Sequence, residues 1–172
     1  MIRAGVTCFA DMYYFEETVA AATADAGMRA LCGQTVLRFP APDATSYEDS
    51  LARARDFIER WRGHPLIVPA PAPHAPYTCT PEILRSCAEL AAEFDVPLHT
   101  HLAETEDENK FCEQIHNCRP LDYLEDCGWL NARTWLAHGI FFNRSEMKRL
   151  GKAGTTISVN YSGVLFKDGT EF

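Results

Sequence analysis

Short apolar runs and longer amphipathic runs alternate along this chain from one end to the other. Apolar runs of about four to eight residues bounded by Gly, Pro or charged residues are typical of strands covered on both faces, and the amphipathic runs are typical of surface helices. The pattern predicts strands over residues 6–10, 29–36, 66–70, 97–101, 134–138 and 155–159. It predicts helices over residues 16–26, 47–62, 81–94 and 144–153, and two more between 106 and 127.

Residues that can cap helices mark the starts of the helical runs. Ser46, Thr105 and Asn143 each stand three residues before an acidic residue, which is the spacing of a capping box. Thr80 precedes Pro81, and proline is favoured at the first helical position. Strands that alternate with capped helices indicate βα units and a parallel sheet, so the predicted fold class is α/β.

The chain length limits how these units can close. The 172 residues are 47% hydrophobic and 23% charged, which is the composition of a globular domain with a core, and we expect one domain. The pattern fits either an open doubly wound sheet or an arc of a (β/α)8 barrel, whose complete form needs about 250 residues. Both architectures place active sites at the carboxyl ends of parallel strands, so the residues at those ends matter most.

Chemically capable side chains gather at the predicted carboxyl ends. His74 follows the third strand, His101 ends the fourth and His138 ends the fifth. Glu104 stands in the short loop after the fourth strand, and Asp11 directly follows the first. Because the carboxyl ends of parallel strands meet at one edge, we expect the histidines and Glu104 to face one pocket.

The segment HTHLAET carries the strongest local signal. Strand alternation sends His99 and His101 to the same face and leaves Glu104 at the strand mouth. A neutral imidazole is a good ligand for zinc or ferrous iron, and a nearby carboxylate can move protons between an activated water and a substrate. We expect the ring nitrogens of His101 and His138 to converge on one point, with Gly139 permitting a sharp exit. Since a catalytic zinc has about three protein ligands, another ligand must come from elsewhere.

Two alternatives stay open on these residues. His74 lies between prolines that stiffen its backbone, which suits the orientation of a substrate, but a proline-rich turn with an incidental histidine gives the same pattern. The His99-Thr100-His101 segment could be the first-strand His-x-His pair of another metallohydrolase barrel. The strands predicted before it count against that interpretation.

Charge and cysteine content exclude several classes. The net charge of −8, without a Lys/Arg run, disfavours nucleic acid as a partner. There is no apolar stretch of about 18 residues and no clean signal-peptide core, so we expect a cytoplasmic protein without a membrane partner. The seven cysteines are an odd number without a C-x-x-C pair, which favours buried thiols over a disulfide framework or a zinc ribbon.

These motifs resemble the aminohydrolases of the amidohydrolase superfamily, which include 5-methylthioadenosine/S-adenosylhomocysteine deaminases, 8-oxoguanine deaminases and triazine chlorohydrolases. The resemblance rests on PHAPYT around His74, HTHLAET around His101 and WLAHG around His138. It implies a distorted TIM-like (β/α)8 barrel holding one divalent metal, with zinc as the first choice and iron as the alternative. It also implies that His101 and His138 are metal ligands, that Glu104 is the proton-shuttling acid and that His74 contacts the substrate. His99 matches no ligand of the family, and we expect it to be packed.

The resemblance is divided on the substrate. Residues 1–15 and 66–78 resemble the adenosine-type deaminases, whereas residues 117–139 are more similar to the 8-oxoguanine branch. What it implies is a small heterocyclic substrate, deaminated or dechlorinated by metal-activated water, and it is compatible with a homo-oligomer.

The chain also departs from the family pattern. The first-strand His-x-His pair and the strand-eight Asp have no counterpart, and SVNYSG at residues 158–163 replaces a His-Cys-Pro-like segment. We therefore expect a partial barrel over residues 1–159, lacking the first and last strands, then a divergent tail over residues 160–172. The leading hypothesis is part of a deaminating hydrolase, and the competing one is a catalytically inactive fragment without metal or activity of its own.

Overall fold

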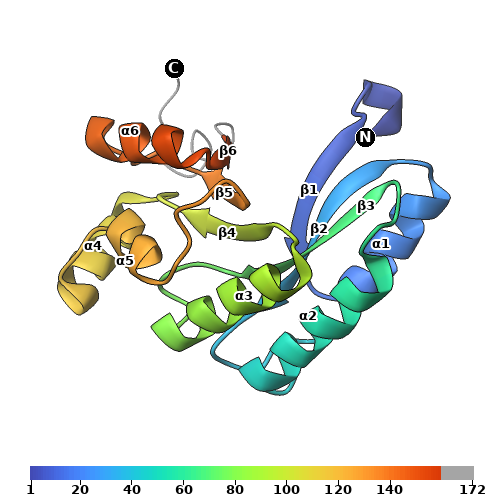
Figure 1. The fold of residues 1–172 in the computed structure, drawn as a ribbon, viewed down its shortest axis with the longest axis horizontal. Helices are drawn as coiled ribbons and strands as arrows, with labels where there is room; N and C mark the ends of the chain where they lie inside the picture. The colour runs from blue at the N-terminus through green and yellow to red at the C-terminus, as the bar shows by residue number, and fades with distance from the viewer. Residues whose placement is uncertain (160–172) are drawn as a thin grey trace.

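The computed structural model describes residues 1–159, which form an α/β fold with parallel strands and helices packed against them (Figure 1). The predicted tail, residues 160–172, lies outside the described residues. In chain order the elements are η1 (Ile2–Ala4), β1 (Cys8–Tyr13), α1 (Glu16–Asp25), β2 (Arg29–Val36), α2 (Tyr47–Trp61), β3 (Ile67–Pro73), α3 (Pro81–Phe94), β4 (Leu98–Leu102), α4 (Glu106–His116), α5 (Pro120–Asp126), β5 (Thr134–His138), α6 (Arg144–Ala153) and β6 (Thr156–Ser158).

The sequence pattern predicted most of these elements. β2, β5, α3 and α6 begin and end at the predicted residues, and the run between 106 and 127 divides into α4 and α5 as expected. The side chains of the four predicted caps, Ser46, Thr80, Thr105 and Asn143, each accept the backbone N–H three residues later. One prediction about β1 was wrong. Asp11 lies inside that strand rather than after it, because pairing with β2 continues through Tyr13 opposite Gln34.

Prolines explain why β3 runs further than predicted and why the sheet divides beside it. β3 continues through Pro71 to Pro73 and stays paired with β2 throughout. The His74 N–H donates to the Val36 carbonyl at 3.2 Å, so even-numbered residues direct their N–H groups toward β2. The odd-numbered prolines therefore cost no donor in that pairing, and they leave β3 with few donors toward β4. The described strands accordingly form two parallel sheets, β1-β2-β3 and β4-β5-β6.

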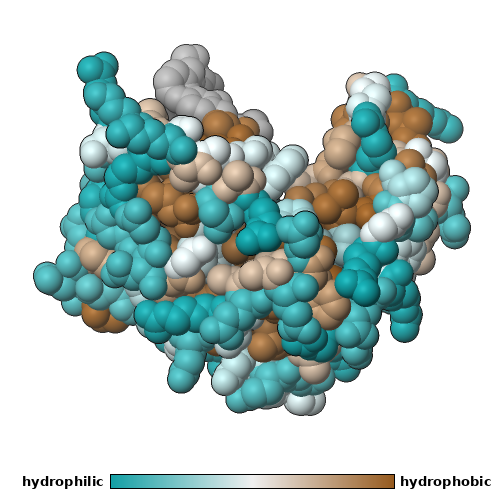
Figure 2. Space-filling model, viewed as in Figure 1, coloured by the Kyte–Doolittle hydropathy of each residue, from teal (hydrophilic) through white to brown (hydrophobic). Residues whose placement is uncertain are grey.

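Each sheet has one face covered by helices, and the opposite face, which no described helix covers, is called the open face. Ala30 and Cys32 on β2 pack in a core cluster with α1 and α2, so Gly33 projects to the opposite, open face. Leu98 and Leu102 on β4 belong to the larger core cluster beneath α3, α5 and α6. The residues between them, His99 and His101, therefore project to the open face. Figure 2 shows a notch between the half of the molecule that contains β1–β3 and the half that contains β4–β6, with hydrophobic residues along the β1–β3 side.

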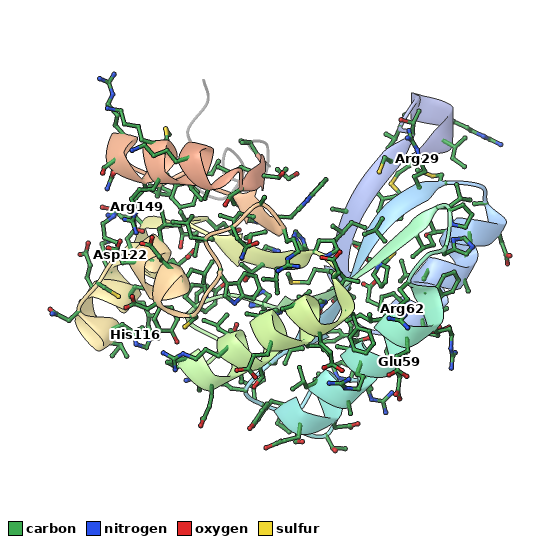
Figure 3. The ribbon with its side chains drawn as sticks, viewed as in Figure 1. Arg29, Glu59, Arg62, His116, Asp122 and Arg149 are labelled. Atoms are coloured by element: carbon green, nitrogen blue, oxygen red, sulfur yellow. The ribbon has the colours of Figure 1, made fainter. Side chains whose placement is uncertain are left out.

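An arginine on α6 fixes that helix against α5. Arg149 contacts Asp122 at 2.6 Å (Figure 3). It also contacts Glu125. A second arginine, Arg119, pairs with Glu146 at 2.7 Å, and that carboxylate is almost fully buried. These pairs hold the helices around β5, at whose end His138 lies.

Five of the seven cysteines are small buried residues, as predicted for most of them, whereas Cys8 is exposed and Cys118 is partly buried. All seven are free thiols, and Cys32, Cys79, Cys87, Cys112 and Cys127 are buried. Within residues 1–159, no helix combines the length and the apolar character that crossing a membrane requires.

Gly33 lies on the open face of β2, where atoms of the neighbouring strands β1 and β3 leave no room for a side chain. A methyl group there would lie 2.7 Å from the Ala72 Cβ and 3.1 Å from the Asp11 carbonyl oxygen. We expect Gly33→Ala to destabilise the protein by about 1–3 kcal/mol through overpacking, measured as the midpoint of urea unfolding. The matched control is Gly151→Ala in α6, where an added methyl group meets no atom within 4 Å. That helical change should be neutral or stabilising by about 0.5–1 kcal/mol. Equal effects of the two changes would refute the packing explanation.

Candidate active site

The ends of two adjacent parallel strands bring His101 and His138 together. β4 and β5 pair in register, with His101 opposite Ala137 and Leu102 opposite His138. The two imidazole rings are nearly parallel, at 26°, and their centroids are 5.3 Å apart. The prediction that these two side chains lie next to each other is confirmed. The prediction that their ring nitrogens converge on one point stays a prediction.

A left-handed backbone turns His138 toward the site. By strand alternation His138 should share the helix-covered face with Leu136, which lies in the main core cluster. His138 instead has a φ of 77°, and Gly139 follows with a φ of 66°. A positive φ is uncommon for a residue with a side chain, although histidine tolerates it better than most. The Gly139 N–H donates to the Leu102 carbonyl at 2.9 Å, which holds the turned strand end against β4.

The hydrogen bonds of His101 fix its tautomer. Its Nδ1 lies 2.9 Å from the backbone carbonyl of His74, which can only accept, so Nδ1 carries the proton. Nε2 is then the nitrogen with a lone pair, and a carbonyl partner at Nδ1 is the usual orienting contact of a metal-binding histidine. The same carbonyl accepts the His101 N–H at 3.0 Å and the Thr100 hydroxyl at 3.2 Å. The segment after β3 is thereby fastened to β4.

Glu104 lies at the mouth of β4, where the sequence placed it. Its carboxylate Oε1 is 3.8 Å from Nε2 of His138, and both side chains are largely buried. Thr105 follows it as the N-terminal cap of α4. A carboxylate beside a histidine nitrogen can accept a proton there and release it a short distance away.

His74 joins the same group from the end of β3. Its ring centroid is 4.9 Å from that of His101, and its Nδ1 lies 2.9 Å from the Thr78 hydroxyl. That hydroxyl donates to the Ala75 carbonyl, so it accepts from His74 Nδ1 and leaves Nε2 as an acceptor. Burial, with a smaller contribution from His101, lowers the pKa of His74 to about 4, against an opposing effect of Glu104. His74 is therefore a neutral imidazole able to accept a hydrogen bond near pH 7.

Two further residues, His99 and Glu108, lie at this site although neither was predicted as a residue of the site. His99 is packed, as expected, with Nδ1 3.1 Å from the Trp135 carbonyl. Burial lowers its pKa to about 4, opposed by that hydrogen bond. Glu108, predicted only as a residue of the α4 cap, is buried and bonded to the backbone of the Glu104 loop. Its spacing from Thr105 was the only sequence signal.

The acids near β1 are not part of this group. Asp11 faces Glu16 and Cys32 on the helix-covered side of the sheet. Burial and then Asp11 raise the pKa of Glu16 to about 8, so Glu16 is mostly protonated near pH 7. The structure therefore does not bring Asp11 together with the histidines.

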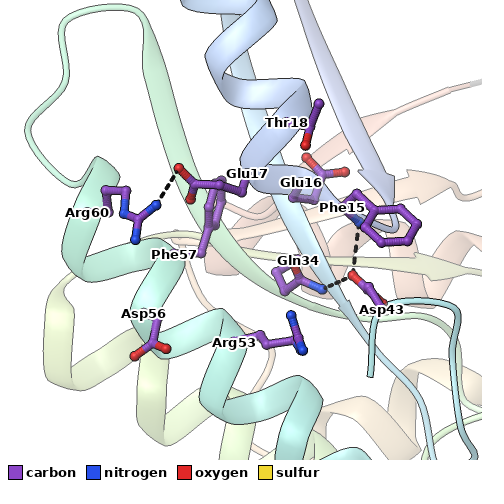
Figure 4. Close-up of a pocket in the computed structure, with 10 residues that line it drawn as sticks. All are labelled: Phe15, Glu16, Glu17, Thr18, Gln34, Asp43, Arg53, Asp56, Phe57 and Arg60. Carbon is purple, nitrogen blue, oxygen red and sulfur yellow. Dashed lines mark hydrogen bonds and ion pairs between the residues drawn. The ribbon is translucent and has the colours of Figure 1, made fainter. Parts of the chain in front are cut away.

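A separate hollow of about 230 Å³ lies between α1 and α2 (Figure 4). Inside it, Asp43 accepts hydrogen bonds from the Phe15 N–H at 2.9 Å and from the Gln34 amide at 3.0 Å. Arg60 pairs with Glu17 at its edge, at 2.9 Å. Its lining contains none of the four predicted site residues.

The donor set at the histidine cluster fits part of a zinc site. Imidazole nitrogen is a suitable donor for zinc, and His101 and His138 would hold the ion from neighbouring strand ends. Among residues 1–159, no cluster of three or more His, Cys, Asp or Glu side chains is arranged to hold a metal. The described residues thus supply two imidazoles, fewer than the three protein ligands usual for a catalytic zinc.

Comparisons with known proteins agree with this arrangement. The sequence profile of the Amidohydrolase family matches residues 1–168. The chain is 40% identical over 158 residues to a 5-methylthioadenosine/S-adenosylhomocysteine deaminase of Thermodesulfovibrio yellowstonii, a match that covers 92% of this chain and 36% of the relative. It is 60% identical over 86 residues to an 8-oxoguanine deaminase of Pseudomonas aeruginosa, covering 50% of this chain and 19% of that protein.

A solved structure is similar over most of the described fold. The crystal structure of an adenosine deaminase from Xanthomonas campestris with bound zinc superposes with a TM-score of 0.88 at 33% identity. The superposition covers 91% of this chain and 36% of that protein. This chain therefore spans about a third of the length of the proteins that it matches over most of its residues.

Proposed function

We propose that this chain, which belongs to the amidohydrolase family, forms the central part of the active site of a hydrolase. That hydrolase removes an amino group from a purine-like ring. The observation that carries the proposal is the meeting of His101, His138 and Glu104 at the ends of adjacent parallel strands. In this proposal the two sheets are an arc of a (β/α)8 barrel.

The metal would be held by His101 and His138, with zinc as the first choice and iron as the alternative. Zinc bound at these residues would allow a water molecule to lose its proton near neutral pH. Glu104 would accept that proton at its carboxylate and deliver it to the ring nitrogen. It would then carry a second proton, released by the hydroxyl group added at the ring carbon, to the departing amine. Its 3.8 Å distance from the His138 Nε2 supports this role, because the carboxylate stands beside the nitrogen that would face the ion.

His74 orients the substrate in this proposal. Its neutral ring presents Nε2 as a hydrogen-bond acceptor next to His101, which suits an N–H or O–H group of a heterocycle. Its contacts with Thr78 and the prolines around it keep the ring in place.

The substrate is a small heterocycle, and neither nucleic acid nor membrane has a role. The names of two relatives, one acting on 5-methylthioadenosine or S-adenosylhomocysteine and the other on 8-oxoguanine, favour deamination of a purine over dechlorination. The net charge of −8 is unfavourable for binding a polyanion. A homo-oligomer and a cytoplasmic location are compatible with this function.

A chimeric protein tests the proposal directly. In the chimeric deaminase, this chain replaces the aligned segment of the Thermodesulfovibrio yellowstonii relative, which supplies the remainder of the barrel. We expect a zinc-loaded, folded protein that releases ammonia from 5-methylthioadenosine, S-adenosylhomocysteine or 8-oxoguanine. A folded chimera that holds zinc and releases no ammonia from any of the three would contradict the proposed reaction.

The second candidate is that the 172-residue chain alone is inactive. What favours it is that two imidazoles, rather than three ligands, meet among the described residues. In that case the isolated chain retains little zinc after gel filtration and releases no ammonia, although the chimera does both. Tightly held stoichiometric zinc in the isolated chain would exclude this candidate.

A further inference from the structure

We propose that Glu108 is a positioning residue whose buried carboxylate fixes the backbone of the loop that carries Glu104. The inference rests on the proposed function for its catalytic consequence, while the backbone contacts themselves are independent of any activity. Glu108 touches neither the rings of the histidine cluster nor a substrate in this proposal.

Both carboxylate oxygens of Glu108 accept backbone N–H groups of the loop. Oε1 lies 2.9 Å from the Ala103 N, and Oε2 lies 3.0 Å from the Glu104 N. The Thr105 hydroxyl in turn accepts the Glu108 N–H at 3.2 Å, which closes a compact ring of contacts over six residues. One side chain therefore holds two consecutive peptide units immediately before the cap of α4.

The loop needs such support because its backbone is strained. Ala103 has a φ of 53°, a left-handed conformation that side-chain-bearing residues rarely adopt and that costs about 1 kcal/mol or more. Its carbonyl accepts the Phe141 N–H at 3.0 Å, from the segment that follows β5. Ala103 is thus held through its N–H by Glu108 and through its carbonyl by the chain beyond His138. This arrangement sets the distance between Glu104 and His138.

Burial separates Glu108 from an ordinary acidic residue in a first helical turn. Glu106 and Asp107 in the same turn have side chains that are 69% and 89% exposed, and they pair with Lys110. Glu108 is only 2% exposed. Burial raises its pKa to about 7, whereas the N–H groups of Ala103 and Glu104 act in the opposite direction. A buried acid is costly unless it is hydrogen-bonded, so its place beneath this loop fits a specific positioning role.

Backbone hydrogen exchange on the full 172-residue chain tests the contacts. In the wild-type protein at pH 8, the amides of Ala103 and Glu104 should be protected. Glu108→Gln keeps the shape but replaces one acceptor oxygen by an NH₂ group, so exchange of at least one of these amides should accelerate about 10-fold or more, as expected for loss of a hydrogen bond to a charged acceptor. Glu106→Gln in the same turn is the matched control and should leave both amides unchanged. Core amides of α3, such as that of Ala91, report global unfolding.

The outcomes are separable from those of the proposed function. Unprotected Ala103 and Glu104 amides in the wild-type chain would overturn the inference even if the Glu108→Gln protein did not fold. So would unchanged exchange of both amides in a folded Glu108→Gln protein.

In the chimeric deaminase, Glu108→Gln should lower kcat about 10-fold with KM and zinc content nearly constant. This loss is smaller than the roughly 10²-fold that a 1 Å misplacement can cost. A raised KM or lost zinc with unchanged kcat would also contradict a positioning role. A chimera without ammonia release would defeat the proposed function and leave the exchange result standing.

Discussion

Glu104→Gln in the chimeric deaminase is expected to lower kcat by about 10²-fold to 10⁴-fold while zinc content stays at the wild-type level, the range typical for loss of a general acid/base. The amide keeps the shape of the side chain and its hydrogen-bonding reach, but it cannot take up and return a proton. Water, ring nitrogen and amine each exchange a proton during deamination, so one missing carboxylate affects every transfer. Steady-state ammonia release and elemental analysis of the same preparations provide the measurement.

Glu106→Gln is the matched control for this substitution. Glu106 lies two residues further along, with its side chain exposed to solvent and close to Lys110. Its replacement removes the same charge from the same region and should leave kcat within about 2-fold, as expected for a surface change. If Glu104→Gln kept near-normal turnover, or lost zinc as readily as a histidine variant, Glu104 would have to be a ligand or a structural residue instead.

Local patterns were sufficient to predict most of the fold, because strands and helices in βα units are specified by periodicity and caps. β2 and α3 begin and end where the pattern placed them, with Thr80 capping α3. The prediction stopped β3 at Ala70 because prolines usually end a strand. β3 can continue through the prolines because they fall on alternate residues, where the missing N–H groups would point away from β2. Only the neighbouring strands reveal that compatibility.

The site was predictable as far as strand ends determine it. His101 and His138 come together because they stand at the ends of two adjacent, paired strands, β4 and β5. The positive φ of His138 turns its side chain from the helix-covered face to the mouth of the strand. The residues before His138 do not indicate this conformation, and the only local sign of it is the glycine that follows, Gly139. The function of Glu108 was equally hidden, since its partners are backbone groups on a loop whose conformation no local pattern specifies. Side chains that support a site are the part a sequence specifies least directly.

Zinc binding by the chimeric deaminase should depend on both histidines together. Even removing a residue that only orients a metal ligand typically weakens metal binding about 10-fold to 100-fold, so His101→Ala should weaken zinc binding by at least about 100-fold. His138→Ala should have an effect of the same size, because the rings face each other at 5.3 Å and either change removes one imidazole from the same site. Competition with a chromogenic chelator at pH 7.5 measures the affinities.

The double variant makes this expectation specific to a shared ion. If both rings bind one zinc ion, the His101→Ala/His138→Ala protein should bind zinc little worse than either single variant, because each substitution already destroys the site. Two independent surface sites would instead give losses that are separate and additive in stoichiometry. His116→Gln, on α4 where the ring stacks on Tyr123, controls for adventitious binding by an imidazole and should leave the affinity unchanged. Wild-type zinc affinity in the double variant would show that the ion binds elsewhere, and the pairing of His101 with His138 would then have to be explained by packing alone.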